Sequence, residues 1–158
     1  MPEQVHDSPL PFVAGHIRRF EQTGGRPRPG FDDLLLTTRG RRTGTLRRTA
    51  LLHLRDDTGD RTTWIVAASN RGAGHHPAWY LNLLADPDVT VQVGTDTVPA
   101  RARPATEEER ARLWQRLITA MPVYRDYQAA TTRQIPLVIL TPRLSQNGRL
   151  ASLLQHDP

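Results

Sequence analysis

The stretch LLLTTRGRRTGTLRRT, residues 34–49, decides the fold predicted for the rest of the chain. Its two ends are apolar or β-branched, and the loop between them is bracketed by Gly40 and Gly44, which predicts a β-hairpin. A guanidinium group binds a phosphate or carboxylate through two parallel N–H···O hydrogen bonds, and glycine lets backbone N–H groups come close to a ligand. The tip is therefore either an anion-binding loop or a solvated basic turn. It carries five arginines: Arg39, Arg41, Arg42, Arg47 and Arg48.

The composition is that of one ordinary domain with an excess of positive charge. A chain of 158 residues can bury roughly two-thirds of its unfolded surface. It contains no cysteine, which excludes disulfides, thiol nucleophiles and thiolate metal sites. No run approaches the ~20 apolar residues of a transmembrane helix, and no signal-peptide pattern opens the chain, so we expect a cytoplasmic protein. The net charge of +5 indicates an anionic partner, which is nucleic acid, a membrane surface or a charged small molecule.

Short strands and helices follow one another along the chain. Apolar spacing predicts a helix over residues 10–20, and a second over 75–85 with Pro77 in its first turn. Thr106 and Glu109 form a capping box that opens a third helix, and a shorter helical piece holds Tyr124 and Tyr127. Residues 1–9 are expected to be a disordered lead. Strands are predicted over 31–38, 46–55, 62–69, 89–93, 98–103 and 135–141.

These elements predict an α+β, mainly β fold. About six strands without regular βαβ alternation argue against a doubly wound sheet, and no GxGxxG or Walker A motif is present. A small antiparallel barrel with peripheral helices fits better. We expect a single domain over residues 1–158, with a tail and short helix over 1–29, the barrel core over 30–142 and a loose tail over 143–158.

The residue types offer little support for hydrolytic or metal chemistry. His75 and His76 are adjacent, so they cannot share a helix face, and no carboxylate cluster accompanies them. No GxSxG motif surrounds Ser69. Tyr124 and Tyr127 lie on neighbouring positions of one helical face, where a tyrosine hydroxyl can donate a proton or the rings can simply pack. Both readings of the tyrosine pair stay open on the residues alone.

Five short motifs together resemble the deazaflavin-dependent nitroreductase family over residues 30–142. Members of that family have a split β-barrel related to the FMN-binding, pyridoxamine-phosphate-oxidase-like fold. They use the reduced deazaflavin coenzyme F-420 to deliver hydride to quinones, nitro compounds or activated alkenes. The motifs occur in the family's order: GRRTG at 40–44 followed by Arg47, VAAS at 66–69, PxWYxNL at 77–83, YxxYQ at 124–128 and IPLV at 135–138.

The resemblance implies three groups of coenzyme-binding residues and a catalytic set. The first group holds the phosphate and the anionic glutamyl tail, and comprises Arg41, Arg42, Thr43 and Arg47; Arg48 is implied as a further coenzyme contact. The second lines the deazaflavin ring with backbone amides and small side chains, and comprises Thr49, Ala50, Leu51, Leu52, Ala67, Ala68, Ser69 and Asn70. The third closes the other edge of the ring, and comprises Ala78, Trp79, Tyr80 and Asn82. The catalytic residues implied are Tyr124, which faces the substrate, with Ser69 and Tyr127 beside it; no metal is expected.

Two positions depart from the family pattern. Asn70 stands where lysine is frequent, although Arg71 can supply the charge, and Met121 stands where the best-known nitroreductase has a third tyrosine. The sequence therefore does not decide whether the hydride acceptor is an enone or other activated alkene, a quinone or a nitro compound.

Other classes of protein also stay open. A protein of the same fold could bind a cofactor or lipid-like ligand without turnover, or use FMN in place of F-420. A basic barrel that binds nucleic acid is a third class. The arginines favour it, but the sequence lacks the aromatic pattern with which such barrels stack bases. We expect a small-molecule substrate, no nucleic acid and no transmembrane segment. Peripheral membrane contact is left open, as is the choice between a monomer and a homodimer.

Overall fold

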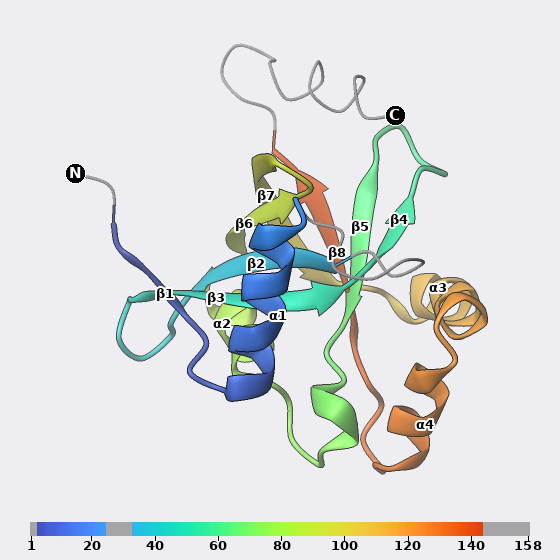
Figure 1. Cartoon of the computed structure of the whole chain (residues 1–158). Helices are drawn as coiled ribbons and strands as arrows, with labels where there is room; N and C mark the ends of the chain where they lie inside the picture. The colour runs from blue at the N-terminus through green and yellow to red at the C-terminus, as the bar shows by residue number, and fades with distance from the viewer. Residues whose placement is uncertain (1–2, 25–32, 144–158) are drawn as a thin grey trace.

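The computed structural model describes residues 3–24 and 33–143, which form one curved sheet with α-helices around it (Figure 1). The helices are α1 (Pro11–Gln22), α2 (Ala78–Ala85), α3 (Glu107–Ala120) and α4 (Val123–Ala129), and a short 3-10 turn, η1, spans Asn70–Gly72. The described strands are β1 (Val5–Asp7), β2 (Asp33–Arg39), β3 (Leu46–Leu52), β4 (Leu54–Asp56), β5 (Thr63–Ala67), β6 (Asp88–Val93), β7 (Asp96–Pro104) and β8 (Leu137–Pro142).

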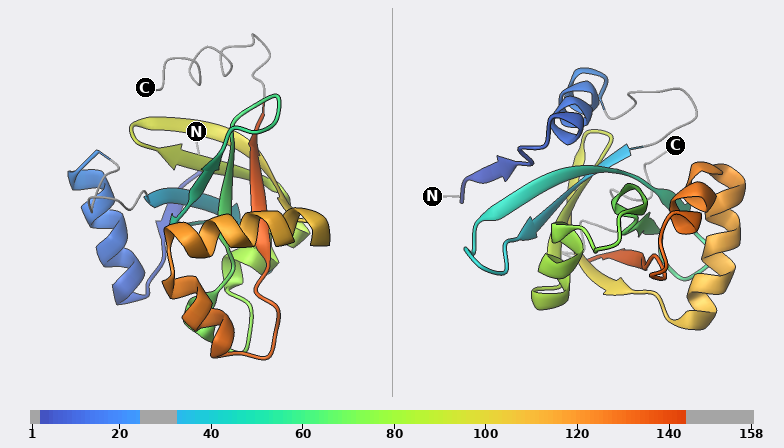
Figure 2. Two further views of the ribbon diagram at one scale, coloured as in Figure 1. Left: turned by 90° about the vertical axis from the view of Figure 1, so that its right-hand side faces the viewer. Right: turned by 90° about the horizontal axis from the view of Figure 1, so that it is seen from below.

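The order of the strands closes the sheet on itself. The strands are hydrogen-bonded in the order β1-β3-β2-β6-β7-β8-β5-β4, and only the β1–β3 pair is parallel. β3 and β4 lie near opposite ends of this order, yet only His53 separates them in the chain. The sheet must therefore curve until its two sides meet, as Figure 2 shows. The split β-barrel expected from the sequence is confirmed.

Residues on alternate positions of the strands divide between a core inside the barrel and the clusters on its outer face. Along β5, Trp64 and Val66 point into the barrel, whereas Ile65 and Ala67 point outward to the helices. This follows from the period of two along a strand, and it explains why residues 64–68 are apolar without interruption. The outer core lies under α3 and α4, to which Leu113, Leu117, Ile118, Met121 and Tyr124 contribute.

Helices α1 and α3 form for reasons that are visible in the sequence. Ile17 and Phe20 of α1 are buried against Leu35 of β2 and Ala50 of β3. At the start of α3, the Thr106 hydroxyl accepts a hydrogen bond from the Glu109 N–H at 3.2 Å, and the Glu109 carboxylate accepts one from the Thr106 N–H at 2.9 Å. The capping box predicted from the sequence is therefore confirmed.

Three sequence expectations differ from the structure. Residues 5–7 are not a disordered lead but a strand, because Asp7 pairs with Arg48 across 41 positions of sequence, a contact that no local pattern reveals. The segment predicted as one strand over 46–55 is broken at His53, where the barrel turns its corner. These two differences account for eight described strands in place of about six. The tail over 144–158 lies outside the described residues.

The third difference concerns Pro77. It has extended backbone angles, φ −67° and ψ 152°, and precedes the first residue of α2 instead of lying in its first turn. The expected helix over 75–85 therefore begins at Ala78, and His75 and His76 lie in the connection before it.

Candidate functional site

The arginine-rich turn between β2 and β3 is tight and closed by its own backbone. The Gly40 N–H donates to the Thr45 carbonyl and the Gly44 N–H donates to the Gly40 carbonyl, both at 2.8 Å. Gly44 has φ +72°, a conformation that side chains other than glycine rarely adopt. The turn therefore holds Arg41 and Arg42 on its exposed surface with a fixed backbone.

Helix α2 is tied to this turn by Asn82. The Asn82 side chain is only 5% exposed, and its carbonyl oxygen accepts from the Arg41 N–H at 3.1 Å. Its amide nitrogen donates to the Thr38 hydroxyl at 3.2 Å. Two of the groups implied by the resemblance, the turn at 41–43 and the helix at 78–82, are thus brought together although they lie 41 positions apart in sequence.

The five arginines of the turn are not equivalent. Arg39 pairs with Glu3 at 2.7 Å, and Arg48 pairs with both Asp7 and Glu21, at 2.6 and 3.0 Å. Within the described residues, Arg42 and Arg47 make no such ion pair, and Arg41 contacts only Asn82. The cations that remain for an external anion are therefore Arg41, Arg42 and Arg47.

The β3 side chains predicted to bind the ring alternate between the inner and the outer face of the barrel. Leu51 packs against the cluster inside the barrel, so the alternate residues Arg47 and Thr49 lie on that face. Ala50 packs under α1, and Leu52 packs against the outer core with α3 and α4. The side chains available to a ligand at the barrel are therefore those of residues 47, 49 and 51, whereas residues 48, 50 and 52 contribute only their backbone.

A turn in a rare conformation follows β5. Ser69 is helical, with φ −76° and ψ −33°, and Asn70 and Arg71 are left-handed, with φ +47° and +55°. Asn70 stabilises the turn by donating from its side-chain amide to the His75 carbonyl at 3.1 Å. Left-handed backbone in residues other than glycine is uncommon, and it concentrates at functional sites.

Arg133 holds this turn from behind, and sequence reasoning missed it. Its guanidinium donates to three backbone carbonyls, those of Ala68 at 3.1 Å, Ser69 at 2.7 Å and Ala73 at 2.9 Å. The same group lies 3.1 Å from His76 Nδ1. No local signal could have found Arg133, because it lies in a coil segment some 60 positions away from its partners.

The two tyrosines of α4 lie next to this turn. Their rings meet edge to face at 5.7 Å between centroids, which confirms the predicted shared face. Tyr124 is 7% exposed and packs in the outer core with Met121. A Cβ built on Gly72, at φ +83°, would lie 3.0 Å from the Tyr127 carbonyl oxygen, so the turn touches the backbone of α4.

The connection from α4 to β8 is fixed by a second polar cluster. The Gln128 side-chain carbonyl accepts from the Ile135 N–H at 2.9 Å and from Arg110 at 3.2 Å, and its amide donates to the Arg133 carbonyl at 2.8 Å. This cluster gives Gln128 of the YxxYQ motif a structural role, because it positions Arg133.

Aromatic side chains at the start of α2 complete the region. The rings of His76 and Tyr80 lie 4.8 Å apart, and Trp79 meets Tyr80 edge to face at 6.3 Å. Burial raises the pKa of Tyr80. Burial and the neighbouring Arg133 lower the pKa of His76, so its imidazole is neutral near pH 7 and accepts from the guanidinium. Ala78 is exposed beside them.

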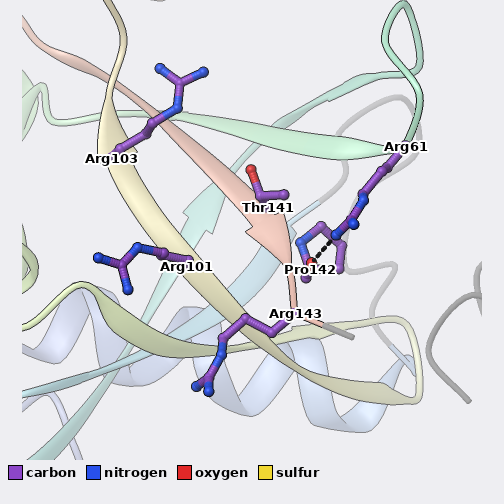
Figure 3. Close-up of a pocket in the computed structure, with 6 residues that line it drawn as sticks. All are labelled: Arg61, Arg101, Arg103, Thr141, Pro142 and Arg143. Atoms are coloured by element: carbon purple, nitrogen blue, oxygen red, sulfur yellow. Dashed lines mark hydrogen bonds between the residues drawn. The ribbon is translucent and has the colours of Figure 1, made fainter. Parts of the chain in front are cut away.

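A depression of about 470 Å³ lies elsewhere, at the other end of β5 and β8 from Ser69 (Figure 3). Its arginines point in different directions. Arg101 and Arg143 both face Asp88, at 3.7 and 3.6 Å, and Arg103 pairs with Glu109 at 2.7 Å. These charges are largely compensated within the protein, so this surface is a weaker candidate than the turn at 40–47.

Two other kinds of site find no support in the part of the chain that the structure describes. No group of three or more histidine and carboxylate side chains gathers there in a way that could hold a metal ion. None of the helices over 3–24 and 33–143 has the length and apolar character needed to cross a membrane.

Comparison with known proteins decides the family. The family model described as F420H(2)-dependent quinone reductase matches residues 12–142. The chain belongs to this family. The expected oxidoreductase that uses coenzyme F-420 is thereby confirmed, as is the resemblance on which that expectation rested.

Two curated relatives come from Mycobacterium tuberculosis. Rv1261c, an F420H(2)-dependent quinone reductase, is 40% identical over 114 residues, which cover 70% of this chain and 73% of that protein. Rv3178, to which the same activity is ascribed, is 42% identical over 110 residues, which cover 70% of this chain and 89% of the relative.

Solved structures agree with the fold and the family. An F420-H2 dependent reductase, FDR-A, is 36% identical, with a TM-score of 0.60, and the match covers 68% of this chain and 92% of that one. A structure described as a domain-swapped dimer is 33% identical, with a TM-score of 0.62, over 84% of this chain and 99% of that one.

Proposed function

We propose that this family member transfers hydride from reduced F-420 to a quinone or another electron-poor acceptor, at a site between the β2–β3 turn, α2, the turn after β5 and α4. The observation that carries this assignment is the pair of hydrogen bonds made by the Asn82 side chain. One joins α2, which carries Tyr80, to the cationic turn at Arg41, and the other joins it to Thr38 of β2. When bound, the coenzyme supplies the hydride; the protein supplies position and electrostatics.

The residues present fit an anionic coenzyme tail. Arg41 and Arg42 are exposed on a turn whose backbone is fixed, and Arg47 extends from the adjoining strand. Guanidinium groups bind phosphate and carboxylate oxygens through paired N–H donors. Within the described residues these three arginines make no ion pair, so an anion would not have to displace an internal carboxylate. We assign the tail to Arg41, Arg42, Thr43 and Arg47, and we give Arg48 no direct role because Asp7 and Glu21 already hold it.

The residues present also fit a flat ring. Ala67 packs in the outer core and Ala68 in the core inside the barrel, so these two small residues would offer the ring their backbone. Ser69, just after β5, is 9% exposed. We assign the ring to residues 67–70 on one edge and to residues 78–82 on the other, with Thr49 and Leu51 on the barrel side of β3. Ala50 and Leu52 would contribute backbone groups only.

We assign the proton-handling role to Tyr124. Its ring is held edge to face by Tyr127 and packed against Met121, which restricts its orientation. A tyrosine hydroxyl so fixed can donate a proton or a hydrogen bond to the oxygen of the acceptor as negative charge develops there. Ser69 would assist as a second donor, and Tyr127 would position the Tyr124 ring.

The tail assignment predicts unequal losses for two coenzymes. FMN has no glutamyl tail, so Arg41→Ala with Arg42→Ala should weaken F-420 binding more than FMN binding, by about 1.5–3 kcal/mol for each charged hydrogen bond lost. Fluorescence titration at fixed ionic strength measures both affinities. The matched control is Arg101→Ala with Arg103→Ala, which removes two arginines from the distant depression. Equal losses for F-420 and FMN would overturn the tail assignment.

The Tyr124 assignment predicts a loss of turnover without a loss of binding. Tyr124→Phe keeps the ring and its packing but removes the hydroxyl, so kcat should fall by about 10²–10⁴-fold while the dissociation constant for F-420 stays nearly unchanged. Stopped-flow oxidation of reduced F-420 by a soluble quinone gives the rate, and titration gives the affinity. A larger loss in Tyr127→Phe would move the role to Tyr127, and equal loss of rate and affinity would argue against both.

The acceptor and the assembly are proposed from the relatives. Rv1261c is named a quinone reductase and the same activity is ascribed to Rv3178, so a quinone is the first acceptor that we propose, ahead of an enone or a nitro compound. The relative that forms a domain-swapped dimer supports a homodimer for this chain.

A further inference from the structure

Arg133 has an unusual set of partners for a partly buried cation. Its described contacts are the carbonyl oxygens of Ala68, Ser69 and Ala73 and the Nδ1 atom of His76, and none of them is a carboxylate. Burial lowers the pKa of this guanidinium. A charge that is partly withdrawn from water without a counter-ion loses hydration, so an arginine placed here calls for a reason beyond ion pairing.

The contacts fix the direction of two backbone N–H groups. No peptide bond in the described chain is cis, so each N–H lies opposite the carbonyl of the same peptide. The Ala68 and Ser69 carbonyls point to Arg133, and the N–H groups of Ser69 and Asn70 therefore point away from it. No described backbone or side-chain acceptor takes a hydrogen bond from either group.

The backbone angles make these N–H groups converge. A helical residue followed by a left-handed one, as in Ser69 and Asn70, turns successive N–H groups toward one point, which forms a concavity that binds oxygen atoms or anions. The left-handed angles of Asn70 and Arg71 are strained and persist only where neighbouring groups hold them. Arg133 donates three hydrogen bonds to the backbone of this turn, and the Asn70 side chain donates one.

We propose that Arg133 is a positioning residue for the reductase reaction: it clamps the turn at 68–73 so that the Ser69 and Asn70 N–H groups remain turned to the coenzyme site. The inference rests on the proposed function only in the identity of the ligand that these N–H groups meet. His76 is part of the clamp, since its neutral ring accepts from the guanidinium and contacts the Tyr80 ring of α2 in a tilted arrangement, with 4.8 Å between the centroids.

The test compares Arg133→Met with the control variant Arg116→Met. Arg116 is another partly buried arginine that donates to a backbone carbonyl, but it also has a carboxylate partner. Arg116 donates to the Arg55 carbonyl at 3.1 Å and to Asp56 at 3.0 Å, beside the start of β5, at the end of that strand opposite the turn. Both methionine variants should lose thermal stability. Only Arg133→Met should also lose kcat/KM at a temperature well below its melting point, by about 10- to 100-fold, the scale of a ligand group displaced by about 1 Å.

Two further readouts separate positioning from a merely structural role. Methylguanidinium at millimolar concentration should restore part of the activity of Arg133→Ala. Ethylammonium should not, because its three N–H donors lie on one nitrogen and cannot span the separate carbonyls that the planar guanidinium reaches. In the absence of coenzyme, amide exchange at Gly72, whose N–H donates to the Ser69 carbonyl at 2.9 Å, should accelerate in Arg133→Met and stay unchanged in Arg116→Met.

Failure of the positioning role and failure of the proposed function would give different results. Loss of stability alone in Arg133→Met, with wild-type kcat/KM and wild-type exchange at Gly72, would overturn the positioning role. A wild-type protein that neither binds nor oxidises F-420 would instead overturn the proposed function, and the exchange measurement would still decide whether Arg133 clamps the turn.

Discussion

At the scale of single residues, Gly72 shows how closely the turn after β5 approaches α4. A Cβ at this position would lie 2.9 Å from the Ala130 Cβ and 3.0 Å from the Tyr127 carbonyl, and the residue has φ +83°. Both facts favour glycine, the first through space and the second through backbone conformation. Gly74 lies in the same connection, has no atoms within 4 Å of a built Cβ, and does not have a left-handed backbone.

The two glycines provide a matched pair of variants. Gly72→Ala should destabilise the protein by about 1–3 kcal/mol, because the backbone is strained for alanine and the turn must move away from α4. It should also slow turnover, since Tyr124 and Tyr127 lie on the helix that is displaced. Gly74→Ala should change neither property. Urea denaturation and steady-state kinetics on both variants check this, and equal behaviour of the two would contradict it.

Residue-scale reasoning from the sequence also had a clear limit in β3. The resemblance implied six consecutive residues, 47–52, as coenzyme contacts. Strand alternation places Ala50 under α1 and Leu52 against the outer core, and Arg48 is paired with Asp7 and Glu21. The tertiary partners of each face of the strand decide which side chains a ligand can reach, and those partners are distant in sequence.

At the scale of elements, α3 begins where the sequence predicts because its start signal is local. The Thr106–Glu109 capping box satisfies two N–H groups that a helix start would otherwise leave unpaired. Arg103 adds a bidentate contact to Glu109, at 2.7 and 2.8 Å, and thereby ties the end of β7 to the helix.

Removing this cap should weaken the helix layer measurably. Thr106→Ala should lower the free energy of unfolding by about 0.5–2 kcal/mol. Thr119→Ala near the other end of α3 should be neutral or slightly stabilising, because its hydroxyl only bonds back to Gln115 and alanine favours helix. Urea denaturation at pH 7 compares the two, and an equal effect of both substitutions would contradict the capping role.

The Glu109 half of the cap has a pH signature. The hydrogen bonds from Arg103 and from the Thr106 N–H lower the pKa of Glu109 from 4.5 to about 2. Because the folded-state pKa is the lower one, this stabilisation is complete above pH 4.5 and is lost as the pH falls toward 2. Glu109→Gln keeps an acceptor for the cap but not the charge. The difference in free energy of unfolding between this variant and the wild type should therefore shrink as the pH falls from 4.5 toward 2, as urea denaturation at several pH values would measure.

At the scale of the whole molecule, the core inside the barrel is built from strands that are distant in sequence. It joins Leu34 and Leu36 of β2 to Trp64 and Val66 of β5 and to Leu140 of β8. No strand can bury its inner face until the sheet has closed, so the core forms only when most of the described chain is in place.

A core substitution far from the site should therefore affect stability but not coenzyme binding. Leu140 is fully buried in the barrel, and Leu140→Ala should lower the free energy of unfolding by about 2–5 kcal/mol. Leu10→Ala, at a position that is 62% exposed, should cost little. Denaturation curves give both values. F-420 affinity of the folded Leu140→Ala protein should match the wild type, and a parallel loss of affinity would contradict the separation of core and site.

The sequence by itself determined the features whose causes lie within a few residues. These are the glycine-bracketed hairpin, the apolar strand predicted over 62–69 and found over Thr63–Ala67, the capped helix and, through short motifs in a fixed order, the family and its coenzyme. The tertiary structure decided what depends on distant partners: the parallel β1, the break at His53 that closes the barrel, and the compensation of Arg39 and Arg48 by carboxylates. It also decided the place of Arg133, because hydrogen bonds to backbone carbonyls leave no pattern in the residues that supply them.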